Sequence, residues 1–395
     1  MRPLEGLRVL ELGTFVSAPY CGKLFAGYGA EVIKVEPPGG DIARAHGPFK
    51  DEKPDPETSA LFLYLNTGKK SVELDVSSVA GREALLKLAA TCDVVIENFR
   101  PADLRAIGLS YQDLAQVNPR LVLISVTAFG QSGPYADYRS NNLVAFAMGG
   151  QMFITGTQED GPLKNGGYQA DYQGGLNAFS AGMLAVLAAE RDGLGQHVDI
   201  SVQQCMAPLL EAGIPYYAYM GRWAGQRRGN HMASFIGIYP CMDGHLGIHV
   251  MPRNWKPFTD AIERPDMFDD PRFRTQSDRA QQNDELMGEF YAWAAGVSKR
   301  DVYARAGAMR APITFVHTMA DLLESPQLRE RGFLQRIDHP VAGPAEYPGP
   351  PWWMGPGAWE AGRAPLLGEH TAEVLGSVGV PKTAVESLRL KEASA

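Results

Sequence analysis

The chain has 395 residues, of which 45% are hydrophobic and 21% are charged, and its formal net charge is −8 at pH 7. These values are ordinary for a soluble globular enzyme of two or three domains, and the negative charge provides no basic surface for nucleic acid. The first residues lack an apolar signal core, and no run approaches the roughly 18 apolar residues of a membrane span, so we expect a cytoplasmic protein without nucleic-acid or membrane partners.

The first half of the chain alternates strand and helix patterns. We expect strands in the apolar runs at residues 7–12, 31–35, 94–96 and 121–126, and helices at residues 18–28 and 81–90. Strands that alternate with helices predict an α/β fold with a doubly wound sheet. The turn at residues 13–22 contains no GxGxxG, and the turn at residues 66–71 lacks the first glycine of a P-loop, so neither NAD nor a nucleoside triphosphate is indicated.

Asp171 lies between two glycine pairs, Gly166-Gly167 and Gly174-Gly175, where an amphipathic helix begins. The apolar residues of the segment 176–187 recur at intervals of three and four, which places them on one helical face. A carboxylate at a helix start accepts hydrogen bonds from free backbone N–H groups and is favoured by the helix dipole, so it should stay ionised at neutral pH. On spacing alone Asp171 is an N-cap, although the glycines would let a ligand approach the backbone closely.

The character of the sequence changes near residue 200. A strand is expected at residues 198–202, and the stretch 209–223 is apolar and rich in tyrosine. Beyond it we expect a β-hairpin of residues 236–241 and 246–250, joined by an Asp-Gly turn. Helices are then expected at about residues 255–263, 284–295, 299–308 and 319–323, and a short one after His370.

The cysteines and histidines indicate no metal site. The four cysteines are widely scattered, so they form neither a CxxC pair nor a disulfide framework, and we expect buried free thiols. His245 and His249 are four residues apart, but the expected hairpin places them on a strand rather than on a helix, which does not favour a zinc pair.

Six sequence blocks occur in a characteristic order. They read LEGLRVLEL (4–12), GAEVIKVEPPGGD (29–41), GKKSVELD (68–75), DVVIENFRP (93–101), AFGQSGPY (128–135) and APLLGEHT (364–371). In this order and spacing they closely resemble the family III coenzyme A transferases, the carnitine and bile-acid CoA-transferase group. The resemblance extends from about residue 3 to about residue 376.

The resemblance implies a large Rossmann-like domain, a smaller inserted α+β domain, and a homodimer whose two chains are threaded through each other. The implied boundaries are 1–200 for the large CoA-binding domain, 201–225 for a linker, 226–325 for the small domain, and 326–395 for a crossing linker and the C-terminal part of the large domain. Isolated monomers would then be poorly stable, because each core would depend on its partner.

Asp171 matches the nucleophilic aspartate of the family. The implied reaction moves CoA from an acyl-CoA donor to a small carboxylic acid through a mixed anhydride and then an aspartyl-CoA thioester. Water must be excluded because it would hydrolyse the anhydride. Backbone N–H groups in the two glycine pairs beside Asp171 are candidates to stabilise the oxyanion. CoA and acyl-CoA enter as substrates, and neither a tightly bound cofactor nor a metal is implied.

The resemblance also places further residues around CoA. The candidate phosphate contacts are Lys69, Lys70, Arg100 and Arg105; the candidate pantetheine wall is Asn98 and Phe99; and the candidate mouth of the site is Ser17, Ala18, Gly133 and Tyr135. For each cation a solvated surface charge is the alternative interpretation. Family members often carry the last arginine one position later, where this chain has Ala106.

Two alternatives remain open. The related 2-methylacyl-CoA racemases add a His-Asp pair to their aspartate, because proton exchange on two faces needs two acid/base groups. Here Ser140 and Asn141 occupy those positions, and neither exchanges a proton at neutral pH. A catalytically silent CoA-binding protein is the other alternative. Some transferases carry a helper glutamate near Asn142 and a glycine-rich loop, whose nearest equivalent here is residues 225–230.

Overall fold

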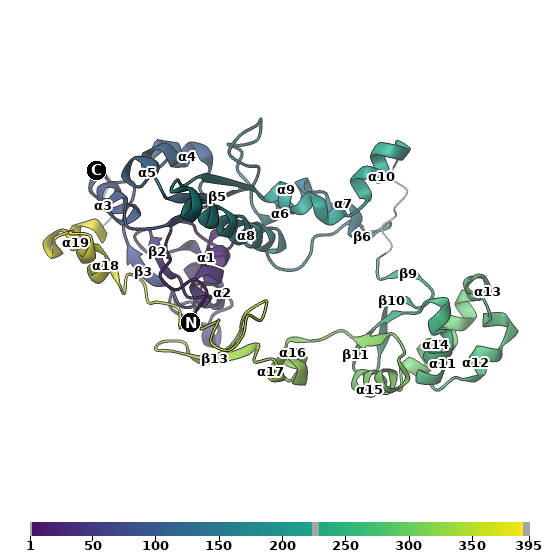
Figure 1. The fold of residues 1–395 in the computed structure, drawn as a ribbon. Helices are drawn as coiled ribbons and strands as arrows, with labels where there is room; N and C mark the ends of the chain where they lie inside the picture. Colours follow the sequence, from purple (N-terminus) through teal and green to yellow (C-terminus); the bar gives the residue numbers. More distant parts are fainter. Residues whose placement is uncertain (1, 223–228, 390–395) are drawn as a thin grey trace. The chain divides into compact units, whose positions relative to one another are not determined.

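The computed structural model describes residues 2–222 and 229–389 (Figure 1). Its chain divides into two compact units. Unit 1 consists of residues 1–154, 164–223 and 330–395, and unit 2 consists of residues 155–163 and 224–329. The N-terminal half and the C-terminal segment of the chain therefore belong to the same unit.

The core of unit 1 is a six-stranded parallel sheet. Its strands are β1 (Arg8–Glu11), β2 (Glu31–Glu36), β3 (Lys70–Glu73), β4 (Val94–Glu97), β5 (Val122–Thr127) and β8 (His197–Ser201). They pair in the order β3-β2-β1-β4-β5-β8. The strand order reverses between β1 and β4, because β2 and β3 lie on one side of β1 and all later strands lie on the other. The α/β class and the parallel sheet predicted from the sequence are confirmed.

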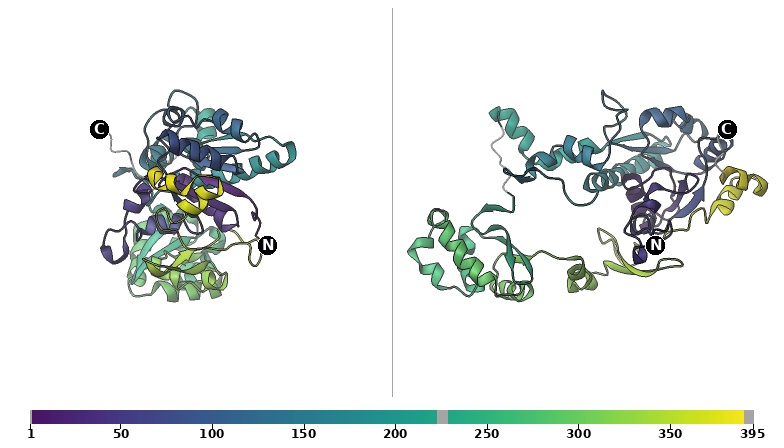
Figure 2. Two further views of the ribbon diagram at one scale, coloured as in Figure 1. Left: turned by 90° about the vertical axis from the view of Figure 1, so that its left-hand side faces the viewer. Right: turned by 180° about the vertical axis from the view of Figure 1, so that it is seen from behind.

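Helices cover both faces of this sheet (Figures 1 and 2). One face packs against α1 (Ser17–Gly27), α6 (Asn142–Met148), α8 (Gln169–Asp192) and α9 (Val202–Met206). The other packs against α3 (Val79–Ala89), α4 (Pro101–Ala106), α5 (Tyr111–Val117), α18 (Thr371–Ser377) and α19 (Lys382–Arg389). Unit 1 also contains η1 (Ile42–Ala45), η2 (Lys50–Glu52), α2 (Ala60–Leu65), α7 (Gln151–Ile154), η3 (Ala207–Leu210), α10 (Gly213–Met220), β13 (Leu334–His339) and β14 (Gly343–Pro348).

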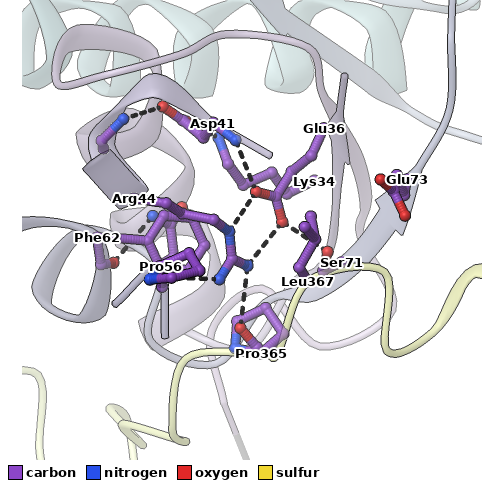
Figure 3. Close-up of polar contacts among 12 residues, drawn as sticks. Lys34, Glu36, Asp41, Arg44, Pro56, Phe62, Ser71, Glu73, Pro365 and Leu367 are labelled. Atoms are coloured by element: carbon purple, nitrogen blue, oxygen red, sulfur yellow. Dashed lines mark hydrogen bonds and ion pairs between the residues drawn. The ribbon is translucent and has the colours of Figure 1, made fainter. Parts of the chain in front are cut away.

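Buried polar contacts join the C-terminal segment to the N-terminal half. The Arg44 guanidinium pairs with the Glu36 carboxylate at 2.7 Å and donates to the Pro365 carbonyl at 3.2 Å, as Figure 3 shows. The backbone N–H of Gly368 donates to the Ser71 hydroxyl at 2.8 Å. Because these groups are buried and mutually satisfied, the segment after residue 360 is an integral part of the sheet domain.

Unit 2 is built on a four-stranded antiparallel sheet. Its strand order is β12 (Ile313–Phe315), β11 (Gly244–His249), β10 (Ile236–Cys241) and β9 (His231–Ala233). The predicted hairpin is confirmed as β10 and β11, and His245 and His249 lie on β11. The remaining elements are β6 (Gly156–Thr157), β7 (Gly161–Pro162), η4 (Pro252–Asn254), α11 (Trp255–Ala261), α12 (Asp266–Asp269), η5 (Pro271–Phe273), α13 (Gln276–Gln281), α14 (Asn283–Ala294), α15 (Lys299–Met309) and α16 (Met319–Leu323), and α17 (Pro326–Glu330) follows.

The part of the chain that the structure describes contains neither a membrane-spanning helix nor a cluster of metal ligands. Over these residues no helix is long and apolar enough to cross a bilayer. Nor do three or more His, Cys, Asp or Glu side chains come together there in a way that could hold a metal ion. All four cysteines are free thiols; Cys21 and Cys92 are buried as expected, whereas Cys205 and Cys241 are only half-buried.

Helices α1 and α8 approach each other closely at Gly175. A Cβ atom at this position would lie 2.5 Å from the carbonyl oxygen of Ser17. No real Cβ sits so close to a backbone oxygen, so glycine permits the contact between the two helices. Since Ser17 begins α1 and Asp171 lies in the first turn of α8, this contact sets the spacing of the two helix starts.

We expect Gly175→Ala to destabilise the protein by about 1 to 3 kcal/mol, because the added methyl group must push α1 and α8 apart. Urea unfolding would measure the loss. Gly307→Ala is the matched control, since Gly307 lies within α15 and a Cβ there has no neighbour within 4 Å. Alanine is the better helix former, so the control should gain up to about 1 kcal/mol. Equal stabilities of the two variants would contradict the packing argument.

Candidate active site

A cavity of about 410 Å³ opens at the carboxyl ends of β1, β4 and β5. Its wall includes residues 14–17 after β1, residues 98–101 after β4 and residues 126–128 at the end of β5. The rest of the wall comes from α6, from the first turn of α8, and from the residues Ile42, His46, Ala136, Tyr138, Ser140, Asn141 and Val202. In open α/β sheets, ligands bind outside the carboxyl ends of the strands where the strand order reverses. Here that reversal lies between β1 and β4, directly below the cavity.

Asp171 lies in the cavity wall, in the first turn of α8. Burial raises the pKa of its carboxyl group from an ordinary value of 3.8 to about 6. Among residues 2–222 and 229–389, none donates a hydrogen bond to this carboxylate. At neutral pH the group is therefore mostly ionised, only half-buried, and unpaired with any described protein group.

The alternative interpretation, in which Asp171 caps its own helix, is wrong. The N-cap residue is Tyr168, which makes no side-chain capping bond. The backbone N–H groups of Ala170 and Asp171 donate instead to the side-chain oxygen of Asn142, at 3.0 and 3.4 Å. A neighbouring helix thus supplies the cap, and the Asp171 carboxylate remains available to a ligand.

Asn98 fixes the loop between β1 and α1. Its side-chain oxygen accepts a hydrogen bond from the Thr14 N–H at 2.9 Å, and its side-chain nitrogen donates to the Thr14 carbonyl at 2.8 Å and to the Ser17 hydroxyl at 3.0 Å. The loops that follow β1 and β4 are adjacent because these strands are neighbours in the sheet. Asn98 therefore joins the two halves of the wall at the strand reversal.

Phe15 has a left-handed backbone conformation in this loop, with φ of 67°. Such a conformation is unfavourable for a bulky residue and persists only where its surroundings enforce it. The Phe15 N–H donates to Asp41 at 3.0 Å, and Asp41 pairs with Lys34 at 2.7 Å; both side chains are labelled in Figure 3. The Phe15 ring makes edge contacts at 4.8 Å with the rings of His46 and Tyr168. The rings of His46, Phe15 and Tyr168 thus form a continuous row that ends at the start of α8.

Of the predicted CoA contacts, the structure gathers four around the cavity with Asp171. Ser17, Asn98, Phe99 and Arg100 all line it. The Arg100 guanidinium forms a two-point ion pair with Asp103, at 2.6 and 2.8 Å, and remains partly exposed. These four residues follow β1 and β4, and the topology of the sheet brings them together.

Three further predicted residues lie outside the wall. Ala18 is fully buried in the first turn of α1. Gly133 and Tyr135 belong to the exposed turn that precedes the cavity segment 136–142, and Tyr135 contacts the cavity residue Tyr138 at 5.2 Å between ring centroids. Their assignment to the mouth of the site stays a prediction.

The remaining cations do not line the cavity. The Lys69 ammonium group is buried and its three N–H donors face protein oxygens: the Glu11 carboxylate, the Pro19 carbonyl and the Asn66 side chain. None is left for a phosphate, so the expected Lys69 contact finds no support in this arrangement.

Lys70 and Arg105 are held by carboxylates elsewhere. Lys70 is the first residue of β3 and so lies at the amino ends of the parallel strands, whereas the cavity opens at their carboxyl ends. Its ammonium group pairs with Glu31 and Glu373 at 2.9 and 2.8 Å. Arg105 pairs with Asp137 at 3.1 Å on the surface. Neither the charge of a residue nor its resemblance to a family position reveals at which end of a strand its side chain lies.

The two glycine pairs beside Asp171 differ in their surroundings. Gly174 and Gly175 are buried within α8, so their N–H groups belong to the helix and are not free to bind an oxyanion. Gly166 and Gly167 precede the helix, and a Cβ at Gly166 would have no neighbour within 4 Å. Only the first pair lies outside the helix, and its oxyanion contact stays a prediction. Of the segment 225–230, the nearest equivalent of a glycine-rich loop, residues 225–228 lie outside the described residues.

Sequence reasoning missed several residues of the wall. They are Phe15, Ile42, His46 and Tyr138. No motif indicates them, because each reaches the cavity through a tertiary contact. Ser140 and Asn141, which occupy the positions of the racemase acid/base pair, also line the cavity.

Comparisons with known proteins agree on one family. The sequence profile of CoA-transferase family III matches residues 4–371. The chain is 33% identical over 384 residues to a subunit of succinyl-CoA:(R)-benzylsuccinate CoA-transferase from Thauera aromatica, covering 94% of this chain and 93% of that one. It is 32% identical to formyl-CoA:oxalate CoA-transferase from Streptomyces avermitilis, with 98% of each chain covered. A crystal structure of a CAIB/BAIF family protein from Brucella suis superposes with a TM-score of 0.86 at 31% identity, covering 95% of this chain and 99% of that one.

Proposed function

Because the chain belongs to CoA-transferase family III, we propose that it moves CoA from a donor acyl-CoA to an acceptor carboxylic acid through covalent intermediates on Asp171. The observation that carries this proposal is the Asp171 carboxylate itself. It lies in a cavity at the strand reversal, half-buried and without a hydrogen-bond partner among the described residues. A weakly solvated, unpaired carboxylate is a better nucleophile than one that is hydrated or held in an ion pair.

In the proposed reaction Asp171 attacks the thioester carbonyl carbon of the donor, the C–S bond breaks, and CoA leaves as its thiolate. The product is a mixed anhydride of Asp171 and the donor acid. The thiolate attacks the Asp171 carbonyl carbon, which releases the donor carboxylate and leaves an aspartyl-CoA thioester. The acceptor carboxylate then attacks the carbonyl carbon of this thioester, the C–S bond breaks, and the CoA thiolate leaves to give a second anhydride. The thiolate finally attacks the acceptor acyl carbon and frees Asp171, so that the thioester's energy is kept throughout.

The cavity wall favours transfer over racemization. Ser140 and Asn141 line the cavity where a racemase would carry its second acid/base pair. A hydroxyl and an amide do not exchange protons with a carbon acid at neutral pH. Asp171 alone could serve only one face of a 2-methylacyl-CoA.

We propose a dicarboxylic acid as the acceptor of CoA. The relatives carry names that pair succinyl-CoA with benzylsuccinate, mesaconate or glutarate, and formyl-CoA with oxalate. The cavity wall of this chain also contains the polar side chains of His46, Ser140 and Asn141, which could receive a distal carboxylate. Succinyl-CoA is therefore the first donor to test.

The test is to trap the intermediate. The protein would be incubated with succinyl-CoA, formyl-CoA and a set of other acyl-CoA donors, quenched with hydroxylamine or borohydride, and digested for mass spectrometry. Modification of Asp171 supports the proposal and identifies the donor. Deuterium exchange at C2 of a 2-methylacyl-CoA without any adduct would overturn it in favour of a racemase. CoA binding with neither signal would indicate a silent CoA-binding protein.

The chain is further proposed to act as an interlocked homodimer in which unit 1 holds CoA. Apolar side chains on α10 support this, since Ile214, Tyr219 and Met220 are each more than half exposed. An apolar groove of about 310 Å³ lies between α7 and α10. Large exposed apolar surfaces of this kind usually mark protein contacts. Light scattering at micromolar concentration should give twice the chain mass of 43.0 kDa; a single-chain mass would contradict the dimer.

A further inference from the structure

Asn142 connects two helices beside Asp171. Its side-chain oxygen accepts hydrogen bonds from the N–H groups of Ala170 and Asp171, and its side-chain nitrogen donates to the Gly167 carbonyl at 3.4 Å. Asn142 is 9% exposed and lines the cavity. It is also the first residue of α6, whose own N-cap, Asn141, accepts from the Val144 N–H at 3.1 Å. The amide that reaches α8 is therefore held by a capped helix.

The first turn of any α-helix has N–H groups without partners inside the helix. An aspartate in that turn ordinarily folds back onto these groups, and this both occupies its carboxylate and lowers its pKa. In α8 the N–H groups of Ala170 and Asp171 are already bonded to Asn142. The Asp171 carboxylate then gains little by folding back, and it faces the cavity.

We propose that Asn142 is a positioning residue, which caps α8 in place of Asp171 and so keeps the Asp171 carboxylate free to attack the thioester. This inference rests on the proposed nucleophilic role of Asp171. It assigns to Asn142 a task that an uncharged side chain can perform, because the amide oxygen caps the helix without placing a second negative charge beside the nucleophile.

The charge of residue 142 matters because few ionisable groups surround Asp171. The cavity wall contains His46, Arg100 and Tyr138. Tyr168 is the N-cap of α8 and Tyr172 lies in its first turn, and α1 contributes Tyr20, whose ring contacts Tyr172 at 4.8 Å between ring centroids. Arg100 is the permanent cation of this set, and it is already paired with Asp103. A carboxylate at position 142 would therefore oppose ionisation of Asp171 with little to offset it.

Two substitutions at this position should move the reaction in different ways. Asn142→Ala removes the cap, so the Asp171 carboxylate should fold back onto the free N–H groups. We expect the rate of adduct formation with succinyl-CoA to fall about 10- to 100-fold. The apparent pKa of Asp171, read from the pH dependence of this rate, should decrease. Asn142→Asp keeps an oxygen cap but adds a charge. In this variant the apparent pKa of Asp171 should increase, and the rate of adduct formation at high pH should come within a few-fold of the wild-type rate.

The experiment measures single-turnover labelling of Asp171 by succinyl-CoA from about pH 5 to about pH 9. Ser78→Ala is the matched control, because Ser78 caps α3 by accepting from the Gly81 N–H at 3.0 Å, away from the cavity. The control should lose stability as Asn142→Ala does but keep the wild-type rate and pH profile. Equal rates in Asn142→Ala and the control, or an unchanged pH profile in Asn142→Asp, would overturn the proposal.

A second measurement does not depend on activity. Amide hydrogen exchange of a peptide covering residues 168–172 reports directly on the capped N–H groups. Faster exchange in Asn142→Ala, but not in Ser78→Ala, is expected; unchanged exchange in Asn142→Ala would overturn the capping role. A wild-type protein that is never labelled at Asp171 would refute the proposed function, and the exchange data would still decide whether Asn142 holds the helix.

Discussion

Asp171→Asn is expected to abolish CoA transfer and to remove the trapped adduct, with at least a roughly thousand-fold loss of rate. The substitution keeps the size and shape of the side chain but replaces the nucleophilic carboxylate with an amide. No other carboxylate lines the cavity among the described residues, so none is placed to take over the attack. Residual transfer within about tenfold of wild type would show that the nucleophile lies elsewhere.

The stability of the same variant provides its control. The pKa of Asp171 is raised by burial to about 6, so at any pH above that value the folded protein bears the cost of a buried charge. The amide introduced by Asp171→Asn has no charge to bury, and the variant should therefore be more stable at pH 7.5 by about 2 kcal/mol. As the pH falls through 6 the wild-type carboxyl group becomes protonated in the folded state, and below 3.8 it is protonated in both states.

The stability gain should consequently shrink as the pH falls and disappear near pH 4, which denaturant unfolding at several pH values would show. An inactive variant that is also more stable at pH 7.5 excludes misfolding as the cause of inactivity. A variant that is inactive and less stable at neutral pH would instead indicate that Asp171 has a structural role.

The sheet was largely predictable because its strands have simple patterns. The expected strand at residues 31–35 is β2 (Glu31–Glu36), and the expected helix at residues 18–28 is α1 (Ser17–Gly27). Strand β3 was not predicted, since in Lys70–Glu73 only Val72 is apolar. Its two central residues, Ser71 and Val72, are buried nonetheless, and the hydroxyl of Ser71 donates to Glu36 at 2.6 Å. A strand whose buried groups are polar and mutually satisfied has no hydrophobic periodicity to detect.

The hairpin of β13 and β14 was also missed, for a different reason. Its second strand, Gly343–Pro348, contains prolines at both ends of a polar segment, a composition typical of loops. The two strands pair with each other alone, so nothing requires the alternation of a half-buried sheet. Hydrophobic periodicity reveals a strand only where alternate side chains are buried, and few side chains of this hairpin are buried.

The site was predictable only where a family motif or a strand end indicated it. Asn98, Phe99 and Arg100 follow a predicted strand, and the topology of an α/β sheet brings such residues together. Lys69 illustrates the limit. In the sequence it is one of two adjacent lysines in a glycine-flanked turn, yet it is buried against Glu11, and its neighbour Lys70 lies at the surface. Contacts between distant segments, such as Asn142 with α8, leave no trace in local sequence.

Glu11→Gln is the second substitution with a large expected effect. Glu11 pairs with Lys34 at 3.0 Å and with Lys69 at 2.7 Å, and all three side chains are at most 1% exposed. Removing one member of a buried ion pair costs about 3 to 5 kcal/mol, because the remaining charge is left without a partner. Glutamine has the shape of glutamate, but its amide oxygen can accept from only one of the two ammonium groups at full strength and its nitrogen is itself a donor.

The pH dependence identifies which lysine is affected. Burial lowers the pKa of Lys69 to about 8, and Glu11 is the main influence that opposes this decrease. Without Glu11 the pKa of folded Lys69 should fall further, so folding near pH 7 would require either a buried unpaired charge or the loss of a proton. Above pH 8 Lys69 is mostly neutral in the folded wild type as well. The part of the Glu11→Gln deficit that comes from Lys69 should thus be complete below the lowered pKa of Lys69 and decrease as the pH rises through 8.

This buried cluster also supports the active site, which is why its loss should reduce activity before the protein unfolds. Lys34 donates to the Gly13 carbonyl at 2.9 Å, and its partner Asp41 accepts a hydrogen bond from the Phe15 N–H. The ion pairs therefore fix the conformation of the loop between β1 and α1, which forms part of the cavity wall. Glu5→Gln, an exposed site on the same segment, should change the stability by less than about 0.5 kcal/mol. If Glu11→Gln is as stable as that control at pH 7, the cluster contributes no net stability, and Phe15 is held by its ring contacts instead.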